Sequence, residues 1–258
     1  MTTFELFALT WKWDPVALGL AAAAPIAYAF ARRPHAWPRA LCCAAAALTF
    51  ALALASPIAT LADGYLFGAH MLQHLLLVLV IPPLALLALG GAASGSVPSR
   101  RRVPTLVAWA MGVGAMWLWH APALCDAAAT SQLVHRVQEG SLLAMGTVFW
   151  WPALAPDPAR RIAPLAGVVY LFGACVACTI LGIAVSLSPV QVCPVYAHPA
   201  DALGILPTLR GDWGLTPERD QQLGGLLMWV PACLVYLVAI LATLRRFYRV
   251  GTGAEVSR

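Results

Sequence analysis

Long apolar runs are the feature that most constrains what this chain can fold into. Seven segments of roughly 18 to 25 residues, each long enough to cross about 30 Å of hydrocarbon, follow one another along the sequence. They cover residues 15–31, 40–60, 68–90, 103–121, 134–154, 163–187 and 222–244. Of the 258 residues, 61% are hydrophobic and only 10% are charged, far from the composition of soluble domains. The sequence predicts an all-α integral membrane protein, a bundle of seven transmembrane helices forming one domain over residues 1–258.

The basic residues predict how this bundle is oriented. Twelve of the 16 lysines and arginines fall in every second connection or in the C-terminal tail. These twelve are Arg32, Arg33, Arg39, Arg100, Arg101, Arg102, Arg160, Arg161, Arg245, Arg246, Arg249 and Arg258. The positive-inside rule places them in the cytoplasm, with the N-terminus outside and the tail 245–258 inside. The long connection 188–221 then lies outside, where we expect it to cap the outer end of the bundle.

Several classes of protein and of segment are disfavoured by composition. The net charge of +5 comes from arginine clusters between apolar runs, so it indicates topology and no nucleic-acid partner. The N-terminus lacks a cationic region, so the first run is expected to be a retained helix and not a cleaved signal. The seven cysteines lie mostly inside apolar runs and do not indicate a disulfide framework. Cys175 and Cys178, three apart, could form a Cu(I) pair, but small-residue packing is the favoured interpretation.

Prolines and tryptophans add two expectations about individual spans. Pro82 and Pro83 lie in the middle of the third run, where their missing N–H donors predict a kink. Trp150 and Trp151 lie near the inner end of the fifth run, where an interfacial aromatic belt is expected.

Four of the six histidines are predicted to share one depth at the outer ends of the spans. His70 and His74 are four residues apart, so they lie one turn apart on the same helix face, a spacing used by metal-binding helices. His120 and His135 flank a short connection between two spans, which brings both to the level of the first pair. Histidines at an interface can simply hydrogen-bond locally, but four at one level favour a metal or cofactor site.

Methionines and one carboxylate accompany the histidines. Met71 adjoins the first pair, Met116 lies one turn below His120, and Met228 lies in the outer turns of the last span. Imidazole and thioether ligands together favour copper, particularly Cu(I), although methionine in an apolar helix also serves as packing. Glu139 follows His135 by one turn. It could be a metal ligand, a hydrogen-bond partner of a ligand or a rim charge, and the sequence leaves all three open.

Four strings in the sequence together resemble one protein family. In order they are HMLQHLLLVLVIPPLALLALG, WLWHAPALCDAA, HRVQEGSLLAMGTVFWWP and DQQLGGLLMWVP. They resemble the CtaG family of multi-span cytochrome c oxidase assembly proteins over about residues 55–245. The resemblance implies a non-enzymatic factor in the cytoplasmic (inner) membrane of a bacterium that helps to mature a haem-copper oxidase. It also implies copper as the bound metal, oxidase subunits as partners and a periplasmic copper chaperone as a donor.

The family's motifs transfer to particular residues of this chain. The HMxQH motif falls on His70, Met71 and His74, and the WHxP motif on His120. The DQxxGxxxW motif falls on Asp220, Gln221, Gly225 and Trp229, which adds Asp220 to the secondary metal candidates. His135 matches the first histidine of an HxxxH motif. Glu139 replaces the second histidine, and Cys125 replaces a tyrosine that commonly follows WHxP, so the ligand set is expected to differ here.

Other functions remain open at this stage. A haem-binding electron-transfer protein could use histidines of neighbouring helices as axial ligands, but no matching pair lies deeper in the bundle. A copper or other metal transporter would need polar residues that continue to the inner face, where the runs are almost purely apolar. A hydrolase is disfavoured because no serine or carboxylate stands in a recognisable relation to a histidine.

Overall fold

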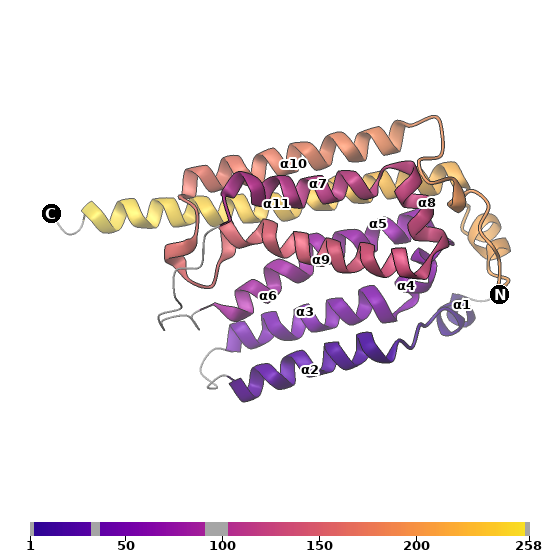
Figure 1. Cartoon of the computed structure of the whole chain (residues 1–258), viewed down its shortest axis with the longest axis horizontal. Helices are drawn as coiled ribbons and strands as arrows, with labels where there is room; N and C mark the ends of the chain where they lie inside the picture. The colour runs from indigo at the N-terminus through magenta and orange to yellow at the C-terminus, as the bar shows by residue number, and fades with distance from the viewer. Residues whose placement is uncertain (1–2, 32–36, 91–102, 256–258) are drawn as a thin grey trace.

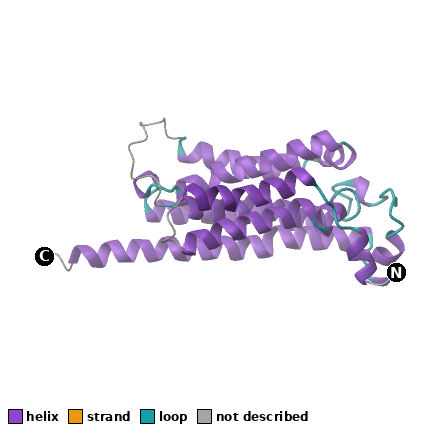
Figure 2. Cartoon of the chain, turned by 90° about the horizontal axis from the view of Figure 1, so that it is seen from below, coloured by secondary structure: helices purple, strands orange, loops and turns teal. Residues whose placement is uncertain are grey.

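The computed structural model describes residues 3–31, 37–90 and 103–255, and within these ranges every regular element is a helix (Figure 2). The elements are α1 (Thr3–Leu9), α2 (Pro15–Ala31), α3 (Trp37–Ala55), α4 (Pro57–Ala62), α5 (Phe67–Leu75), the π-helical turn η1 (Leu76–Val80), α6 (Ile81–Leu89), α7 (Thr105–Trp119), α8 (Pro122–Thr130), α9 (Gln132–Leu154), the 3₁₀ turn η2 (Pro158–Arg160), α10 (Pro164–Leu187), the 3₁₀ turn η3 (Pro194–Tyr196), the π-helical turn η4 (Pro207–Asp212) and α11 (Pro217–Glu255).

The long helices lie side by side along one axis (Figure 1). The seven predicted segments fall, in order, on α2, α3, the α5–η1–α6 unit, α7, α9, α10 and α11. The short helices α1, α4 and α8 gather with the connection 188–216 at one end of the bundle (Figure 1). At the opposite end, α11 extends past its neighbours toward the C-terminus.

Four helical segments are long and apolar enough to cross a membrane by length and composition: Trp37–Ala55, Phe67–Leu89, Pro164–Leu187 and Pro217–Tyr248. Pro15–Phe30 and Thr105–Trp119 are apolar but shorter. Helix α9 is long enough, but its first two turns carry His135, Arg136 and Glu139. The chain is therefore a helical protein with several membrane-spanning candidates among its described residues.

The helix limits differ from the predicted segment limits at three places. The segment 40–60 is divided, because Ser56 ends α3 and caps α4, its Oγ accepting from the Ile58 N–H at 3.1 Å. The connection after α10 ends at residue 216, since α11 begins at Pro217. The tail from 245 is helical through Glu255. His35 lies outside the described residues.

The proline pair interrupts its helix, as predicted. The interruption also explains why Trp150 is buried and does not lie at an interface. Because Pro82 has no N–H, the Val78 carbonyl loses its partner within the helix. The Trp150 indole Nε1–H donates to that carbonyl at 3.0 Å, beside the π-helical turn η1. Trp150 is therefore only 1% exposed and belongs to the core, which corrects its predicted place in an interfacial belt. Trp151 is 40% exposed, as a belt residue should be.

Helices α10 and α11 cross closely at two glycines. A Cβ added to Gly182 would lie 2.9 Å from the Gly225 carbonyl oxygen, and one added to Gly225 would lie 2.7 Å from the Gly182 carbonyl oxygen. Only residues without a side chain permit this approach. The crossing fixes the first turns of α11, which carry Asp220 and Gln221, against the rest of the bundle.

Candidate metal centre

The structure brings the four predicted histidines together inside the bundle. His70 and His74 lie one turn apart on α5, His120 follows the last residue of α7, and His135 lies in the first turn of α9. The ring centroid of His70 is 4.2 Å from that of His74 and 5.7 Å from that of His135, and the His74 and His120 centroids are 5.6 Å apart. All four residues are at most 5% exposed. The cluster is therefore an interior site and not an open rim.

The polar atoms of this cluster are poorly satisfied. Both ring nitrogens of His70 and His74 and the Nδ1 of His135 lack a hydrogen-bond partner among the described residues. The Ala62 carbonyl lies near His70 and the Gln138 amide lies near His74, but neither completes a hydrogen bond. Each buried polar group left without a partner costs about 1–3 kcal/mol. Such a concentration of bare nitrogens favours a ligand that accepts their lone pairs.

His120 forms a second, more specific arrangement with Met71. Its Nδ1–H donates to the Met116 carbonyl at 2.6 Å; a carbonyl can only accept, so Nδ1 carries the proton. In the neutral ring Nε2 then presents a lone pair, and it lies 3.0 Å from the thioether sulfur of Met71. An imidazole donor thus faces a soft thioether donor, and copper is a metal that accepts both. Met116 contributes its carbonyl, and Met228 is buried in the core on α11.

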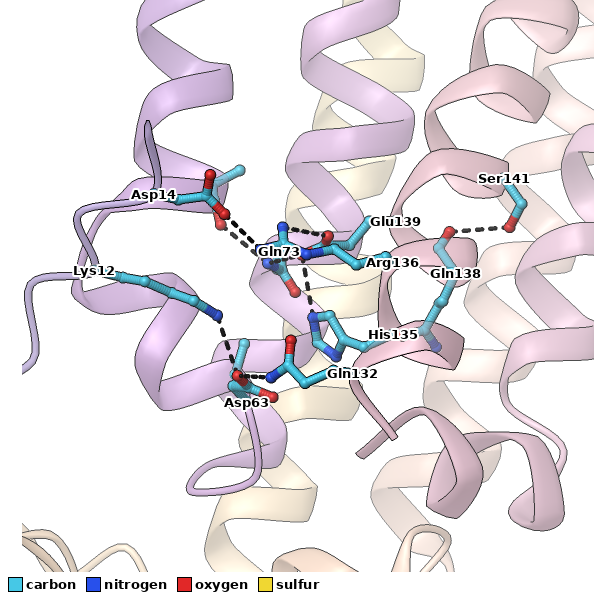
Figure 3. Close-up of polar contacts among 12 residues, drawn as sticks. Lys12, Asp14, Asp63, Gln73, Gln132, His135, Arg136, Gln138, Glu139 and Ser141 are labelled. Carbon is cyan, nitrogen blue, oxygen red and sulfur yellow. Dashed lines mark hydrogen bonds and ion pairs between the residues drawn. The ribbon is translucent and has the colours of Figure 1, made fainter. Parts of the chain in front are cut away.

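Glu139 holds His135 in one orientation. Its Oε1 accepts from the His135 ring Nε2–H at 3.1 Å and from the Gln73 amide at 3.0 Å (Figure 3). Its Oε2 accepts from Arg136 at 3.1 Å, and Arg136 also pairs with Asp14 before α2. With its oxygens used in this way, Glu139 is placed as a partner that directs the bare Nδ1 of His135, one of the three roles the sequence left open.

A second carboxylate, Asp63, ties the outer connections together. It pairs with Lys12 at 3.1 Å and accepts from the Gln132 amide at 2.8 Å (Figure 3). Burial tends to raise the pKa of Asp63, but the Lys12 ammonium, together with His135 and the Gln132 hydrogen bond, outweighs it, so that the pKa lies below its ordinary value. This contact anchors the segment before α2 to the start of α9.

Asp220, a secondary metal candidate, has both oxygens engaged by the backbone. It accepts from the Phe67 N–H at 2.8 Å and the Gly68 N–H at 2.9 Å, the first amides of α5. These amides have no partner within the helix, and a negative charge is stabilised at a helix N-terminus. Asp220 therefore caps the helix that carries His70 and His74. The neighbouring Gln221 accepts from the Val192 N–H at 2.7 Å and so fixes the outer connection.

The outer connection covers the histidines, and a disulfide that the sequence did not indicate secures it. Tyr196 is 1% exposed, its ring centroid lies 5.6 Å from that of His70, and its hydroxyl donates to the Ala62 carbonyl at 2.7 Å. Cys193 forms a disulfide with Cys125 of α8. The prediction that the cysteines form no disulfide is thus wrong for this pair. The two cysteines are 68 positions apart in the sequence, so no local spacing pointed to the bond.

The remaining thiols lie apart from the histidines. Cys175 of α10 and Cys233 of α11 place their sulfurs 3.0 Å apart, and the Thr179 hydroxyl lies 3.3 Å from Cys233. Cys178 is buried one turn further along α10, 3.8 Å from the Tyr236 hydroxyl. Cys175 and Cys178, for which the sequence favoured packing over a Cu(I) pair, therefore both contact α11.

No three His, Cys, Asp or Glu side chains within the described ranges converge closely enough to hold one ion. The pair of His120 and Met71 is a different donor set, because it joins an imidazole to a thioether. The arrangement therefore provides one preformed soft pair, with the bare nitrogens of His70 and His74 beside it.

Fold and cluster together define a helical membrane protein that keeps imidazole and thioether donors in its interior. Its family follows from comparison with known proteins. The chain belongs to the cytochrome c oxidase caa3 assembly factors (Caa3_CtaG), whose family model matches residues 24–250. The resemblance inferred from the four sequence strings is confirmed, and the match extends beyond the range they covered.

The similarity to other known proteins is weaker. A protein of Mycobacterium leprae described as "Uncharacterized protein ML1998" is 24% identical over an alignment of 208 residues, and the match covers 71% of this chain and 30% of that protein. The chain thus spans less than a third of the length of this relative. No solved structure matches the chain.

Proposed function

We propose that this chain binds Cu(I) at the cluster of His70, His74, His120 and Met71 and passes it to a subunit of a cytochrome c oxidase. The observation that carries the proposal is the lone pair of His120 Nε2 facing the Met71 sulfur at 3.0 Å. Cu(I) accepts both donors without requiring deprotonation, since a neutral imidazole and a thioether are already in their binding forms. In this role the chain acts without catalysis, and copper is its cargo.

The proposed topology has seven spans, with the N-terminus and the histidine cluster on the periplasmic side of the bacterial inner membrane. The Cys125–Cys193 disulfide supports this orientation, because disulfides persist in the periplasm and are rare in the cytosol. The arginine clusters at the opposite end support it independently. A periplasmic chaperone could then deliver copper from the outer side.

The aromatic packing between the histidines and the inner end of the bundle favours a copper-binding protein over a copper transporter. Phe149 stacks on Tyr170 with 5.0 Å between ring centroids, and Trp150 stacks on Tyr236 at 6.0 Å. Phe149 lies 14 residues beyond His135 on α9, about 21 Å along the helix. A path for a metal ion through this aromatic layer would need several packed rings to move. Likewise, histidine rings 4.2 to 5.7 Å apart leave no gap for a haem macrocycle.

Metal binding by the purified protein tests the proposal. We expect about one Cu(I) per chain by competition with a coloured Cu(I) chelator, and no Soret band. The variant His70→Ala/His74→Ala should insert normally but lose most of this binding and fail to restore oxidase activity in cells lacking the chain. His198→Ala, a change in the outer connection, is the matched control and should behave as the parent protein. Full oxidase activity in the double variant would contradict the site assignment.

A further inference from the structure

Helix α7 begins and α9 ends at the end of the bundle opposite α8 (Figure 1). A cavity lies there, lined by residues of both helices. Its volume is about 590 Å³, within the range of roughly 300–1,000 Å³ that ligand sites occupy. Ala108 and Val148 contribute apolar walls, and the half-exposed Trp151 flanks them. Arg160 and Arg161 line the same cavity. An apolar slot that ends at two guanidinium groups is chemically suited to an amphipathic anion.

The positive charge beside this cavity is only partly neutralised. Arg160 lies 3.5 Å from Asp157, the one carboxylate whose described side chain lies at this end. Arg161 is close enough to Arg246 of α11 that burial and the second guanidinium together lower the pKa of Arg161. Three arginines thus share one carboxylate among the described side chains. Arginine stays charged at any physiological pH, so the cluster needs an outside anion.

The orientation of Arg161 leaves it able to bind a phosphate. Its Nε–H donates to the Ala155 carbonyl at 2.8 Å, just past the end of α9, while Arg246 donates to the Ala153 carbonyl at 3.5 Å. These bonds fix both side chains. A guanidinium held through Nε still has its Nη groups, which can engage phosphate oxygens in a bidentate manner.

We propose that this cavity binds one anionic phospholipid, with its phosphate on Arg160 and Arg161 and an acyl chain along the apolar wall between α7 and α9. The location fits, because the cavity opens where the apolar helices end and a tryptophan of the interfacial kind lies beside it. Basic pockets between transmembrane helices on the cytoplasmic side are suited to acidic lipid headgroups. The site is distinct from the histidine cluster and independent of copper.

Native mass spectrometry of the full chain in detergent tests the proposal, with dioleoyl phosphatidylglycerol and dioleoyl phosphatidylcholine added in equal amounts. We expect the acidic lipid to bind preferentially to one site. Each arginine near a charged membrane surface contributes about fivefold to the affinity, so Arg160→Gln/Arg161→Gln should reduce the preference by about 25-fold. Arg245→Gln removes the same charge from an exposed position on α11 at the same end and should leave the preference unchanged.

A charge-conserving variant and a competition with inorganic phosphate complete the test. Arg161→Lys keeps the charge but lacks the fork of Nη donors, so its preference should lie between those of the parent protein and Arg161→Gln. A preference in Arg161→Gln equal to that of the parent protein would overturn the proposal. Millimolar inorganic phosphate should not displace the lipid. Displacement by phosphate alone, or equal binding of the two lipids, would likewise overturn it. Thermal unfolding of each variant in lipid-free detergent checks that the fold is intact.

Discussion

The histidine end of this bundle, called the outer half, and the opposite end, called the inner half, differ in how they satisfy buried polar atoms. In the inner half Trp150 donates to the Val78 carbonyl, Tyr170 donates to the Phe149 carbonyl at 2.7 Å, and the Tyr236 hydroxyl lies 3.8 Å from the Cys178 sulfur. In the outer half, His70, His74, Gln138 and others hold bare polar atoms among the described residues. A bundle can satisfy such atoms, as the inner half demonstrates. The unpartnered atoms of the outer half therefore lower the stability of the fold. Such atoms are common at binding sites.

The largest expected effect is at the preformed soft pair. Replacing His120 with alanine removes the imidazole donor, so Cu(I) affinity should fall by about 100-fold, the upper end of what disturbance of a metal site costs. Met71→Leu keeps the volume and should cost about tenfold. Chelator competition measures both. Met145→Leu on α9 is the control, and an unchanged affinity in His120→Ala would show that the two halves do not differ in the way proposed.

Replacement of Glu139, at the same end of the bundle, should have a smaller effect on Cu(I) affinity. Glu139→Gln keeps the shape but weakens the acceptor for His135, so Cu(I) affinity should fall by about tenfold while the protein remains folded. Glu218→Gln removes a fully exposed carboxylate at the start of α11 and should change nothing. If Glu139→Gln instead raised the affinity, the carboxylate would be competing with the metal for His135.

Substitutions in the inner half should change the stability of the protein but not its affinity for Cu(I). Trp150→Phe leaves the Val78 carbonyl without a partner, which should lower the free energy of unfolding by about 1–3 kcal/mol. Trp151→Phe, at a half-exposed site, should cost less than about 0.5 kcal/mol. The midpoint of thermal unfolding in detergent measures both. A loss of Cu(I) affinity in Trp150→Phe would show that the inner half also contributes to metal binding, which contradicts this prediction.

The smallest effect concerns acid stability through Asp63. Because the pKa of this carboxyl is lower in the folded protein, its pair with Lys12 stabilises the fold at neutral pH. That contribution is lost as the pH falls from the ordinary range of an aspartate through the lowered folded-state pKa. Asp63→Asn should therefore lower the thermal midpoint at pH 7 and flatten its dependence between about pH 5 and pH 3. An equal acid slope in parent and variant would exclude this pair as a contributor.

Much of the outer site could be predicted from the sequence because the signals are local. The i,i+4 spacing of His70 and His74 and the position of His120 at the end of an apolar run depend only on helix geometry and hydropathy. The break at Ser56 was missed, although Ser56-Pro57 is a local helix-start signal. The role of Glu139 stayed open, since its partner Gln73 lies on another segment, as does Asp14, which shares Arg136 with it.

By itself the sequence determined the apolar helices, the arginine pattern and the depth of the histidines, because each follows from the order of residues along one segment. Only the tertiary structure decided that Asp220 caps α5 from 153 residues away, that Tyr196 covers His70 and that Cys125 bonds to Cys193. It also decided which nitrogen of His120 is free, through the Met116 carbonyl and the approach of Met71. Apart from the Met116 carbonyl, which lies four residues before His120, these contacts join residues far apart in the chain. Their formation depends on how the helices pack, which no local pattern encodes.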